Sequence, residues 1–233
     1  MEKFPKGSSE SIVEVTVIPD TCYLLQFELP PDNRLEPVML DGFYDALTWI
    51  EHQEDALPLV TTSKIEKFYS NGLNFEKATS TEGFFTKKFY RTLLKFLEFP
   101  YPTIALVNGH AFAGGFMLAA HHDYIVMNPN KGFLCINEVQ FGAPLLPPMA
   151  ALFRIKYGTL MALKAGLTAH RYNAQEAFKL GIVHALGGLE EAKQLALKVK
   201  PFSTSPSYSS IRSEILAELV SVTKNFQIAN PKL

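Results

Sequence analysis

The chain has 233 residues, a formal net charge of −1, 47% hydrophobic residues and 19% charged residues. These values are those of a globular, core-forming chain, and the near-neutral charge without a basic run argues against a nucleic-acid partner. No apolar run approaches the roughly 20 residues that a helix needs to span a bilayer, so no membrane span is expected. Cys22 and Cys135 have neither metal-ligand nor disulfide-framework spacing, which predicts buried, reduced thiols.

The N-terminal part predicts a β-hairpin. Apolar residues alternate with polar ones over residues 13–17, a second strand-like run covers residues 22–29, and Pro19-Asp20 is the turn between them. The segment Pro30-Pro31-Asp32-Asn33 then breaks the chain.

Helical and strand patterns alternate through the middle of the chain. Apolar residues at helical spacing predict a helix from Val38 to about Gln53, and a strand follows at residues 57–62. A glycine turn comes next, then a helix whose apolar stripe runs from Phe85 to Leu97, then a buried strand at residues 103–107. This recurrence by itself indicates an α/β fold.

Two further strands are expected at residues 123–127 and 132–136, and from Pro147 onward the chain reads as mainly helical. A loop at residues 201–207 precedes a last amphipathic helix that spans residues 211–222. We therefore divide the chain into a core of residues 1–200 and a short C-terminal helical segment and tail of residues 201–233.

Two glycine-containing turns follow two of the predicted strands. Residues 107–115 read V-N-G-H-A-F-A-G-G and open an apolar helical segment, and residues 68–75 read F-Y-S-N-G-L-N-F after the strand at 57–62. Glycines let a backbone approach a ligand closely, and free N–H groups at a helix start favour negative charge on a ligand oxygen. Two such turns can aim two N–H donors at one oxygen, as an oxyanion hole requires.

These motifs resemble the crotonase, or enoyl-CoA hydratase/isomerase, superfamily. Residues 69–74 stand where that family carries F-S-A-G-x-D, and residues 107–115 stand where it carries V-N-G-x-A-x-G-G-G. The segment from His170 to Val183 matches its G-x-x-x-x-A-x-E-A-x-x-x-G-L-V, so the similarity covers roughly residues 13–186 in the family's order. The resemblance implies a crotonase-like spiral of ββα repeats with a C-terminal helical region.

The resemblance also implies the chemistry. Hydratases of this family use two glutamates, but this sequence has Met117 at the first position and keeps only Glu138 at the second, within N-E-V-Q-F-G. That pattern resembles Δ3,Δ2-enoyl-CoA isomerases of fatty-acid β-oxidation, in which one carboxylate suffices as a proton shuttle. We expect Glu138 to be catalytic and the backbone N–H groups of Leu73 and Gly114 to form the oxyanion hole. The expected substrate-binding residues are Ser70, Asn71, Gly72, Gly115, Met117 and Asn137.

Alternative functions remain open at this point. A non-catalytic crotonase-fold protein that binds acyl-CoA is favoured if Glu138 faces away from the pocket, and a hydratase working with one carboxylate is the weaker alternative. A dienoyl-CoA isomerase would need acidic residues at Met117 and near Leu146, which are both apolar. Histidines at positions 110, 121 and 122 lack a partnering cysteine or carboxylate cluster at ligand spacing, so no metal site is expected.

The remaining expectations concern partners and location. The substrate is an acyl-CoA thioester, so coenzyme A belongs to the substrate and no separate cofactor is expected. The family resemblance implies a homotrimer or hexamer, although the C-terminal segment is short for the usual hexamer. Pro231-Lys232-Leu233 resembles the peroxisomal Ser-Lys-Leu signal and predicts a peroxisomal location, or a cytoplasmic one if that signal is not read.

Overall fold

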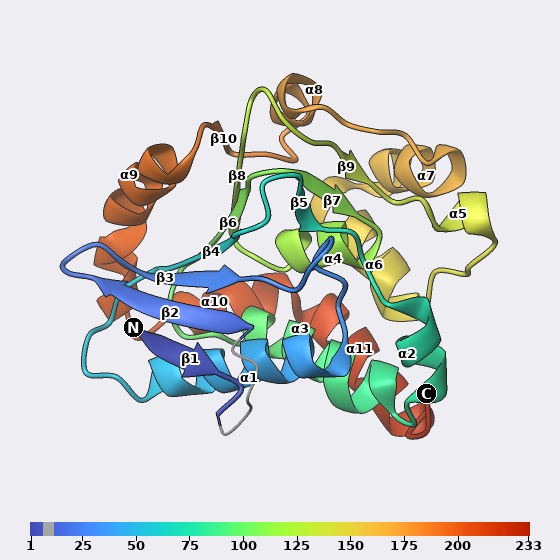
Figure 1. Ribbon diagram of the computed structural model, residues 1–233, viewed down its shortest axis with the longest axis horizontal. Coiled ribbons are helices and arrows are strands. Elements are labelled where there is room, and N and C mark those ends of the chain that lie inside the picture. The colour runs from blue at the N-terminus through green and yellow to red at the C-terminus, as the bar shows by residue number, and fades with distance from the viewer. Residues whose placement is uncertain (7–11) are drawn as a thin grey trace.

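Two β-sheets form the centre of the computed structural model, which describes residues 1–6 and 12–233 (Figure 1). The larger sheet has the strand order β1-β2-β3-β4-β6-β8-β10, and the smaller sheet has the order β5-β7-β9. The strands are β1 Glu2–Phe4, β2 Val13–Ile18, β3 Cys22–Phe27, β4 Leu59–Ser63, β5 Phe68–Ser70, β6 Thr103–Val107, β7 His110–Phe112, β8 Tyr124–Met127, β9 Leu134–Cys135 and β10 Ala185–Leu186.

Successive turns of the chain each give one strand to either sheet. β4, β6 and β8 pair in parallel in the large sheet, and β5, β7 and β9 pair in parallel in the small one. Only the N-terminal hairpin of β2 and β3 and the edge strand β1 are antiparallel among the described strands. This arrangement is the spiral of ββα repeats, so the predicted fold class is confirmed.

The helices cover the large sheet on both faces (Figure 1). Helix α9 contacts β3, β4 and β6, whereas α4 contacts β6 and β8, and α1 contacts β1 and β2. The helices are α1 Pro37–Glu51, α2 Phe75–Ser80, the π-helix η1 Phe84–Phe89, α3 Tyr90–Leu97, α4 Gly114–Ala120, α5 Glu138–Phe141, α6 Pro147–Tyr157, α7 Thr159–Thr168, α8 Ala174–Lys179, α9 Leu189–Val199, the 3₁₀-helix η2 Lys200–Thr204, α10 Tyr208–Ile215 and α11 Ala217–Ala229.

Alternation along the strands divides the core into two clusters. Leu25, Leu59 and Ala105 belong to the main cluster, which includes the apolar sides of α1, α3 and α4. Their chain neighbours Val60 and Ile104 belong to a second cluster closed by Ala192, Ala196 and Val199 of α9. Because strand side chains alternate between faces, the continuous apolar runs predicted from sequence are those of strands buried on both sides.

Several short elements differ from the sequence expectation. The turns predicted at residues 68–75 and 107–115 contain the three-residue strands β5 and β7, which are too short to show an alternating pattern. The helix expected around residues 85–97 is divided into η1 and α3, and the last helix is interrupted at Leu216, whose φ of −102° and ψ of 17° leave the helical region.

The C-terminal helices are packed against the rest of the chain. Helix α11 contacts α6 and α3, and Leu219 on it is fully buried in the main core. Arg212 of α10 donates from Nη1 to Asp123 Oδ2 at 2.8 Å, and its other Nη donates to the Phe99 carbonyl. No helix in the described part of the chain is both long and apolar enough to cross a membrane.

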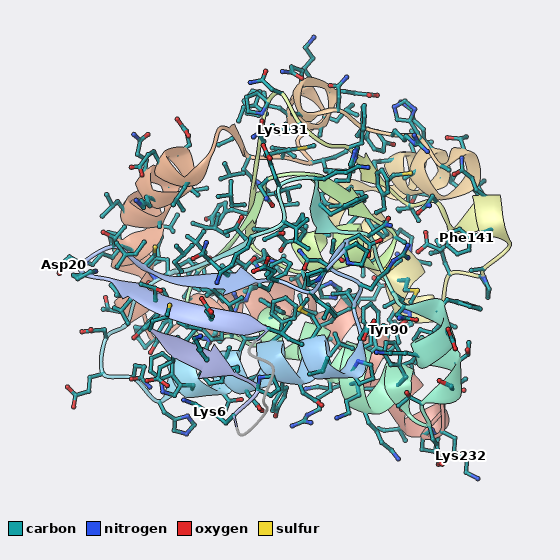
Figure 2. The ribbon with its side chains drawn as sticks, viewed as in Figure 1. Lys6, Asp20, Tyr90, Lys131, Phe141 and Lys232 are labelled. Atoms are coloured by element: carbon teal, nitrogen blue, oxygen red, sulfur yellow. The ribbon has the colours of Figure 1, made fainter. Side chains whose placement is uncertain are left out.

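The last residues fold back beside η1, close to α2 in Figure 1. The Lys232 carbonyl accepts from Gly83 N at 3.1 Å, and the Leu233 carbonyl accepts from Thr86 N and from Thr86 Oγ1, each at 3.2 Å. Lys232 nevertheless projects from the edge of the molecule in Figure 2, where Asp20 and Phe141 also lie at the periphery.

Candidate active site

The loop after β5 carries the first of the two glycine turns. Gly72 has φ of +82°, and a Cβ atom there would lie 2.9 Å from the Phe112 carbonyl oxygen and 3.2 Å from Gly114 N. Glycine is therefore required by both backbone conformation and space. The loop brings Leu73 against the second turn, since a Cβ at Gly114 would lie 3.2 Å from Leu73 Cδ2.

The second turn lies between β7 and α4. A Cβ atom on Gly115 would lie 2.2 Å from the Ser70 carbonyl oxygen, so the two turns are in direct backbone contact. Ala113, just before α4, has φ of +49° and ψ of −122°, a conformation that strongly favours glycine. Ala113 stands where the family motif has its first glycine, so a strained alanine lies beside Gly114.

The backbone N–H groups of Leu73 and Gly114 have no hydrogen-bond acceptor among the described residues. The Gly72 carbonyl accepts from Leu35 N at 2.8 Å, so the N–H of Leu73, on the same planar trans peptide, points in the opposite direction. Gly114 is the first residue of α4, and a first-turn N–H has no partner within its own helix. Two unpaired donors therefore stand at the junction of the two turns.

A short and rigid connection links this junction to Glu138. Ala113 N donates to the Cys135 carbonyl at 2.8 Å, which fixes the residue before Gly114 to the end of β9. Glu138 follows Cys135 by three residues, a length of chain that spans at most about 10 Å. Leu73, Gly114 and Glu138 are thus brought to one region by three different elements.

The Glu138 side chain is buried, with 8% of its surface exposed, and its Oε2 has no hydrogen-bond partner among the described residues. Burial raises the pKa of its carboxyl from 4.5 to about 7, and the interaction with its own backbone N–H offsets only part of that rise. A buried carboxyl group without a cationic partner is unusual for structure alone and typical of a general base.

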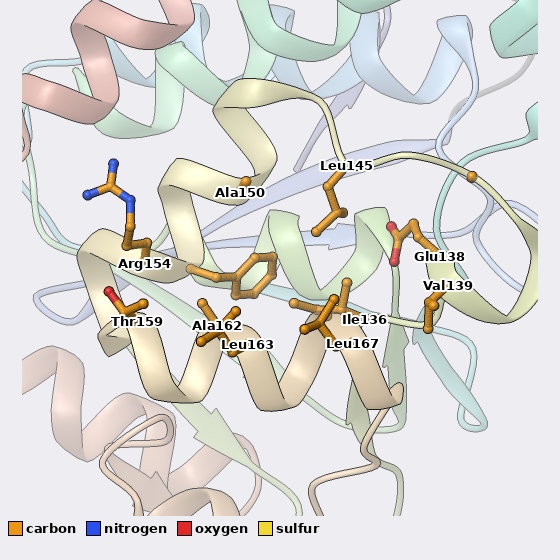
Figure 3. A pocket seen from close by; sticks show the side chains of 13 residues that line it. Ile136, Glu138, Val139, Leu145, Ala150, Arg154, Thr159, Ala162, Leu163 and Leu167 are labelled. Atoms are coloured by element: carbon orange, nitrogen blue, oxygen red, sulfur yellow. The ribbon is translucent and has the colours of Figure 1, made fainter.

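Glu138 lies at one end of an apolar cavity of about 440 Å³ (Figure 3). The cavity runs between α6 and α7, and Arg154 and Thr159 lie at its other end in Figure 3. Its lining residues are Ile136, Glu138, Val139, Ala143, Leu145, Ala150, Phe153, Arg154, Thr159, Ala162, Leu163, Gly166 and Leu167. Glu138 is the sole carboxylate among these described lining residues, and the volume falls within the range of small-ligand sites.

Of the other predicted site residues, Ser70 and Asn71 are bonded to segment 32–35, whereas Met117 and Asn137 lie in the core and next to Glu138. Ser70 is fully buried, its hydroxyl donates to the Asn33 carbonyl at 2.7 Å, and Asn71 is bonded to Asp32. Met117 is 1% exposed and belongs to the main core, whereas Asn137 adjoins Glu138 and has a buried Oδ1 without a partner among the described residues. Direct contact of these residues with substrate stays a prediction.

Two of the three histidines weighed as metal ligands are fully buried and bonded within the fold. His121 Nδ1 lies 2.7 Å from the Met117 carbonyl, and His122 Nε2 lies 2.9 Å from Thr61 Oγ1. Burial lowers the pKa of both imidazoles to about 3, so both are neutral near pH 7. These bonds hold the C-terminal end of α4.

Sequence reasoning missed two groups of residues at this site. The cavity residues of α6 and α7, among them Phe153 and Gly166, were expected only to be helical. Segment 32–35, whose first two residues were predicted only as part of the chain break at residues 30–33, bonds the loop that carries Leu73. The available signal was Asn33 after two prolines, because asparagine readily adopts the left-handed conformation found there, with φ of +54°.

The spiral of ββα repeats is a crotonase-type fold, and the two convergent glycine turns and the buried carboxylate lie within it. The chain belongs to the enoyl-CoA hydratase/isomerase family, whose model matches residues 18–213. The predicted family is thus confirmed.

Curated relatives place the chain closer to the isomerase branch. It is 30% identical to peroxisomal enoyl-CoA delta isomerase 1 of Arabidopsis thaliana, over 86% of this chain and 88% of that protein. It is also 30% identical to peroxisomal enoyl-CoA delta isomerase 2 of that plant, over 91% of this chain and 96% of the relative. Carnitinyl-CoA dehydratase of Salmonella typhi is 31% identical, but over only 59% of this chain and 55% of that protein.

Solved structures confirm the fold. An apo enoyl-CoA isomerase of Mycobacterium tuberculosis superposes with a TM-score of 0.82 at 16% identity, covering 94% of this chain and 97% of that one. An enoyl-CoA hydratase of Bacillus halodurans gives a TM-score of 0.78 at 17% identity, covering 94% and 92%. Both activities occur among these neighbours, so the fold alone does not choose between them.

The burial of Glu138 predicts a pH-dependent loss of stability. Its folded-state pKa of about 7 lies above the ordinary value of 4.5, so the folded protein binds more protons between these values. Stability contributed by the protonated form is therefore present below pH 4.5 and is lost as pH rises through 7, by an amount on the order of 3 kcal/mol. We expect Glu138→Gln to be more stable than the wild type at pH 8 and about equally stable at pH 4.5.

Urea unfolding at several pH values measures this difference. Glu54→Gln, which removes a carboxylate from an exposed side chain, is the control for the loss of charge. A stability gain for Glu138→Gln that is the same at pH 4.5 and pH 8 would show that the Glu138 carboxylate is not destabilised by burial.

Proposed function

We propose that this protein is a Δ3,Δ2-enoyl-CoA isomerase that moves the double bond of 3-enoyl-CoA to give 2-trans-enoyl-CoA in the β-oxidation of unsaturated fatty acids. The observation that carries this proposal is the buried, unpartnered carboxylate of Glu138 at the end of an apolar cavity. The names of the Arabidopsis thaliana relatives support the same assignment.

The reaction requires one base and one oxyanion site. Glu138 removes a proton from C2 of the substrate, the C–H electron pair forms a C1–C2 double bond, and the carbonyl π electrons move onto the thioester oxygen. The C3–C4 double bond is retained in this dienolate, and the C2–C3 double bond forms when the oxyanion collapses and C4 is protonated. The N–H groups of Leu73 and Gly114 donate to that oxygen and stabilise the enolate. Glu138 then returns the proton to C4, so the same carboxylate is restored and no cofactor is consumed.

The rate gains expected from a general base and from an oxyanion hole support a mechanism that uses one carboxylate and two backbone donors. Removing one oxyanion donor typically raises a barrier by about 2.7–4 kcal/mol, and a positioned general base contributes roughly 10²–10⁴-fold. A carboxyl with a pKa of about 7 is a stronger base than an exposed glutamate and is still largely ionised at slightly alkaline pH.

The competing functions have less support from the site. A non-catalytic binding protein was favoured only if Glu138 faced away from the pocket, whereas Glu138 lines the cavity (Figure 3). A hydratase commonly holds water between two carboxylates, but Met117 occupies the first of these positions and is packed in the core. With one carboxylate beside an apolar cavity, proton transfer is favoured over addition of water.

We expect purified protein to convert trans-3-hexenoyl-CoA to the conjugated product, and Glu138→Gln to lower kcat by about 10²–10⁴-fold because the base is removed. The formation of the conjugated thioester is followed by its ultraviolet absorbance. Hydration of 2-hexenoyl-CoA is measured beside it and should be negligible. Tight acyl-CoA binding without turnover of either substrate would instead support the binding-protein alternative.

The same assay gives a pH profile. Because Glu138 must be deprotonated, kcat/KM should fall about tenfold per pH unit below pH 7 and level off above it. A profile that is flat between pH 5.5 and 8 would argue against Glu138 as the base.

The cavity supports binding of the acyl chain beyond C4. Leu145, Phe153 and Leu163 provide an apolar lining that leads away from the Glu138 carboxylate. Gly166 on α7 leaves room in this lining, since a Cβ atom there would lie at an ordinary 3.6 Å from Leu145 Cδ1. We infer that the cavity holds the apolar end of the substrate.

Gly166→Leu should therefore discriminate by chain length. We expect kcat/KM for trans-3-decenoyl-CoA to fall at least about tenfold relative to trans-3-hexenoyl-CoA, because methylene groups in an apolar pocket contribute 10–200-fold. Gly166→Ala serves as the smaller matched change. Equal losses for both substrates would exclude this cavity as the acyl site.

Exposed apolar side chains adjoin the cavity on α5 and α7. Val139, Phe141, Leu163 and Leu167 are each 49–69% exposed, and Phe141 lies at the outer edge of the molecule in Figure 2. A patch of this kind supports association with further copies of the chain, and we propose a homotrimer or hexamer. Light scattering in solution gives the mass that tests this assembly, and a monomeric mass would contradict it.

We further propose a peroxisomal location, which the names of two relatives support. The Lys232 and Leu233 carbonyls are bonded to the start of η1, so Pro231-Lys232-Leu233 must detach before a receptor can bind it. A fluorescent reporter fused to the last ten residues should enter peroxisomes if the tripeptide acts as a signal, and a diffuse cytosolic distribution would contradict this.

A further inference from the structure

Segment 32–35 lies along the loop that carries Leu73 and is bonded to it at every step. Its backbone and side chains bond to each residue from Tyr69 to Asn74. The contacts are Asn33 Nδ2 to Tyr69 O at 3.2 Å, Ser70 Oγ to Asn33 O at 2.7 Å, Asn71 N to Asp32 O at 3.0 Å, Leu35 N to Gly72 O at 2.8 Å, Arg34 Nη1 to Leu73 O at 3.2 Å and Asn74 N to Leu35 O at 3.4 Å.

These bonds determine where the N–H of Leu73 points. Leu35 N holds the carbonyl of the peptide before Leu73, and Arg34 holds the carbonyl of the peptide after it. Each peptide is planar, so two fixed carbonyls leave little freedom for rotation of the N–H between them. The direction of this donor is therefore determined by segment 32–35.

Asn33 is the centre of this arrangement. It is fully buried, and its φ of +54° turns the chain so that Asp32 and Leu35 both face the loop. Its Oδ1 accepts from Leu29 N at 2.6 Å, and its Nδ2 donates to Ser63 Oγ at 2.6 Å as well as to Tyr69 O. One side chain thereby joins the segment just after β3, the last residue of β4 and the middle of β5.

We propose that Asn33 is a positioning residue that fixes the direction of the Leu73 N–H towards the thioester oxygen. This inference rests on the proposed function, because Leu73 is assigned there as an oxyanion donor. Asn33 touches no reacting atom. It acts by holding Tyr69 and Ser70 in place, from which Gly72 and Leu73 follow, and Ser70 Oγ in turn accepts from Gly72 N at 3.2 Å.

Asn33→Gly is the direct test, because glycine accepts the left-handed conformation and keeps the backbone bonds while the side-chain bonds are lost. We expect kcat for trans-3-hexenoyl-CoA to fall about 10- to 100-fold, as small misplacements of catalytic groups do. The dissociation constant of hexanoyl-CoA, which has no double bond to shift, should stay within about twofold. An oxyanion donor acts mainly in the transition state, so kcat rather than binding should change.

Thr92→Val is the matched control for the loss of a buried hydrogen bond. Thr92 is 1% exposed, and among the described residues its hydroxyl donates to the Leu40 carbonyl of α1 at 3.2 Å, which belongs neither to segment 32–35 nor to the loop of residues 69–74. It should lower the unfolding midpoint in urea without changing kcat. Asn33→Asp is the second variant, since it keeps the side-chain shape and an acceptor but removes the donor to Ser63 and Tyr69, and it should lower kcat as well.

A separate readout is enolate binding, followed by the near-ultraviolet absorbance of acetoacetyl-CoA, whose acidic C2 ionises without an isomerisation step. Wild-type protein should lower the apparent pKa of the bound thioester more than Asn33→Gly does. Unchanged kcat and unchanged enolate binding in a folded Asn33→Gly would overturn the positioning role. Wild-type protein that binds enolate but isomerises no 3-enoyl-CoA would overturn only the proposed function.

Discussion

The direct backbone contact between the two glycine turns is the constraint on which the site depends. A Cβ atom at Gly115 would lie 2.2 Å from the Ser70 carbonyl oxygen, and one at Gly72 would lie 2.9 Å from the Phe112 carbonyl oxygen. No other residue fits at either position without movement of the backbone. This contact places the Leu73 and Gly114 N–H groups together, and the small sheet of β5, β7 and β9 keeps the turns in register with Glu138.

The site is maintained at a cost to local stability. Glu138 is buried without a cation, which raises the pKa of its carboxyl, and Ala113 holds a conformation that suits glycine. Strained or poorly compensated residues persist only where the surrounding structure determines them strongly. Here the surroundings are the Ala113 N–H bond to Cys135, the fully buried α4 and the bonds of segment 32–35. The most constrained part of the chain is therefore also the part with unsatisfied donors and an unsatisfied carboxylate.

The sequence predicted the long elements and the family. It did not predict the short strands β5 and β7 or the residues whose partners lie far along the chain. The hairpin of β2 and β3 and the buried strands β4 and β6 follow from apolar patterning, which is decided by burial over five or more residues. Strands β5 and β7 have three residues each, so their pairing is decided by contacts far along the chain. Glu138 was predicted from its motif and lines a cavity, but that cavity depends on how α6 and α7 pack, and no local pattern contains that information. Asn33 was read as part of a break because three of its bonding partners, Ser63, Tyr69 and Ser70, lie 30 to 37 residues away.

Met117 is the position at which the proposed isomerase differs from the hydratases of the family. At this position a carboxylate would have to be kept ionised at the start of α4, whereas the methionine is packed in the main core with 1% exposure. Its burial requires no polar partner, so α4 can close against α6 through Phe116 and Phe153, whose rings are 5.0 Å apart. Where hydratases of the family carry a carboxylate that holds water, this chain therefore has an apolar side chain packed in the core. This favours the proposed proton transfer over hydration, because hydration would need a group here to position water for attack on C3 of the conjugated thioester, and the apolar surroundings of Glu138 raise its basicity.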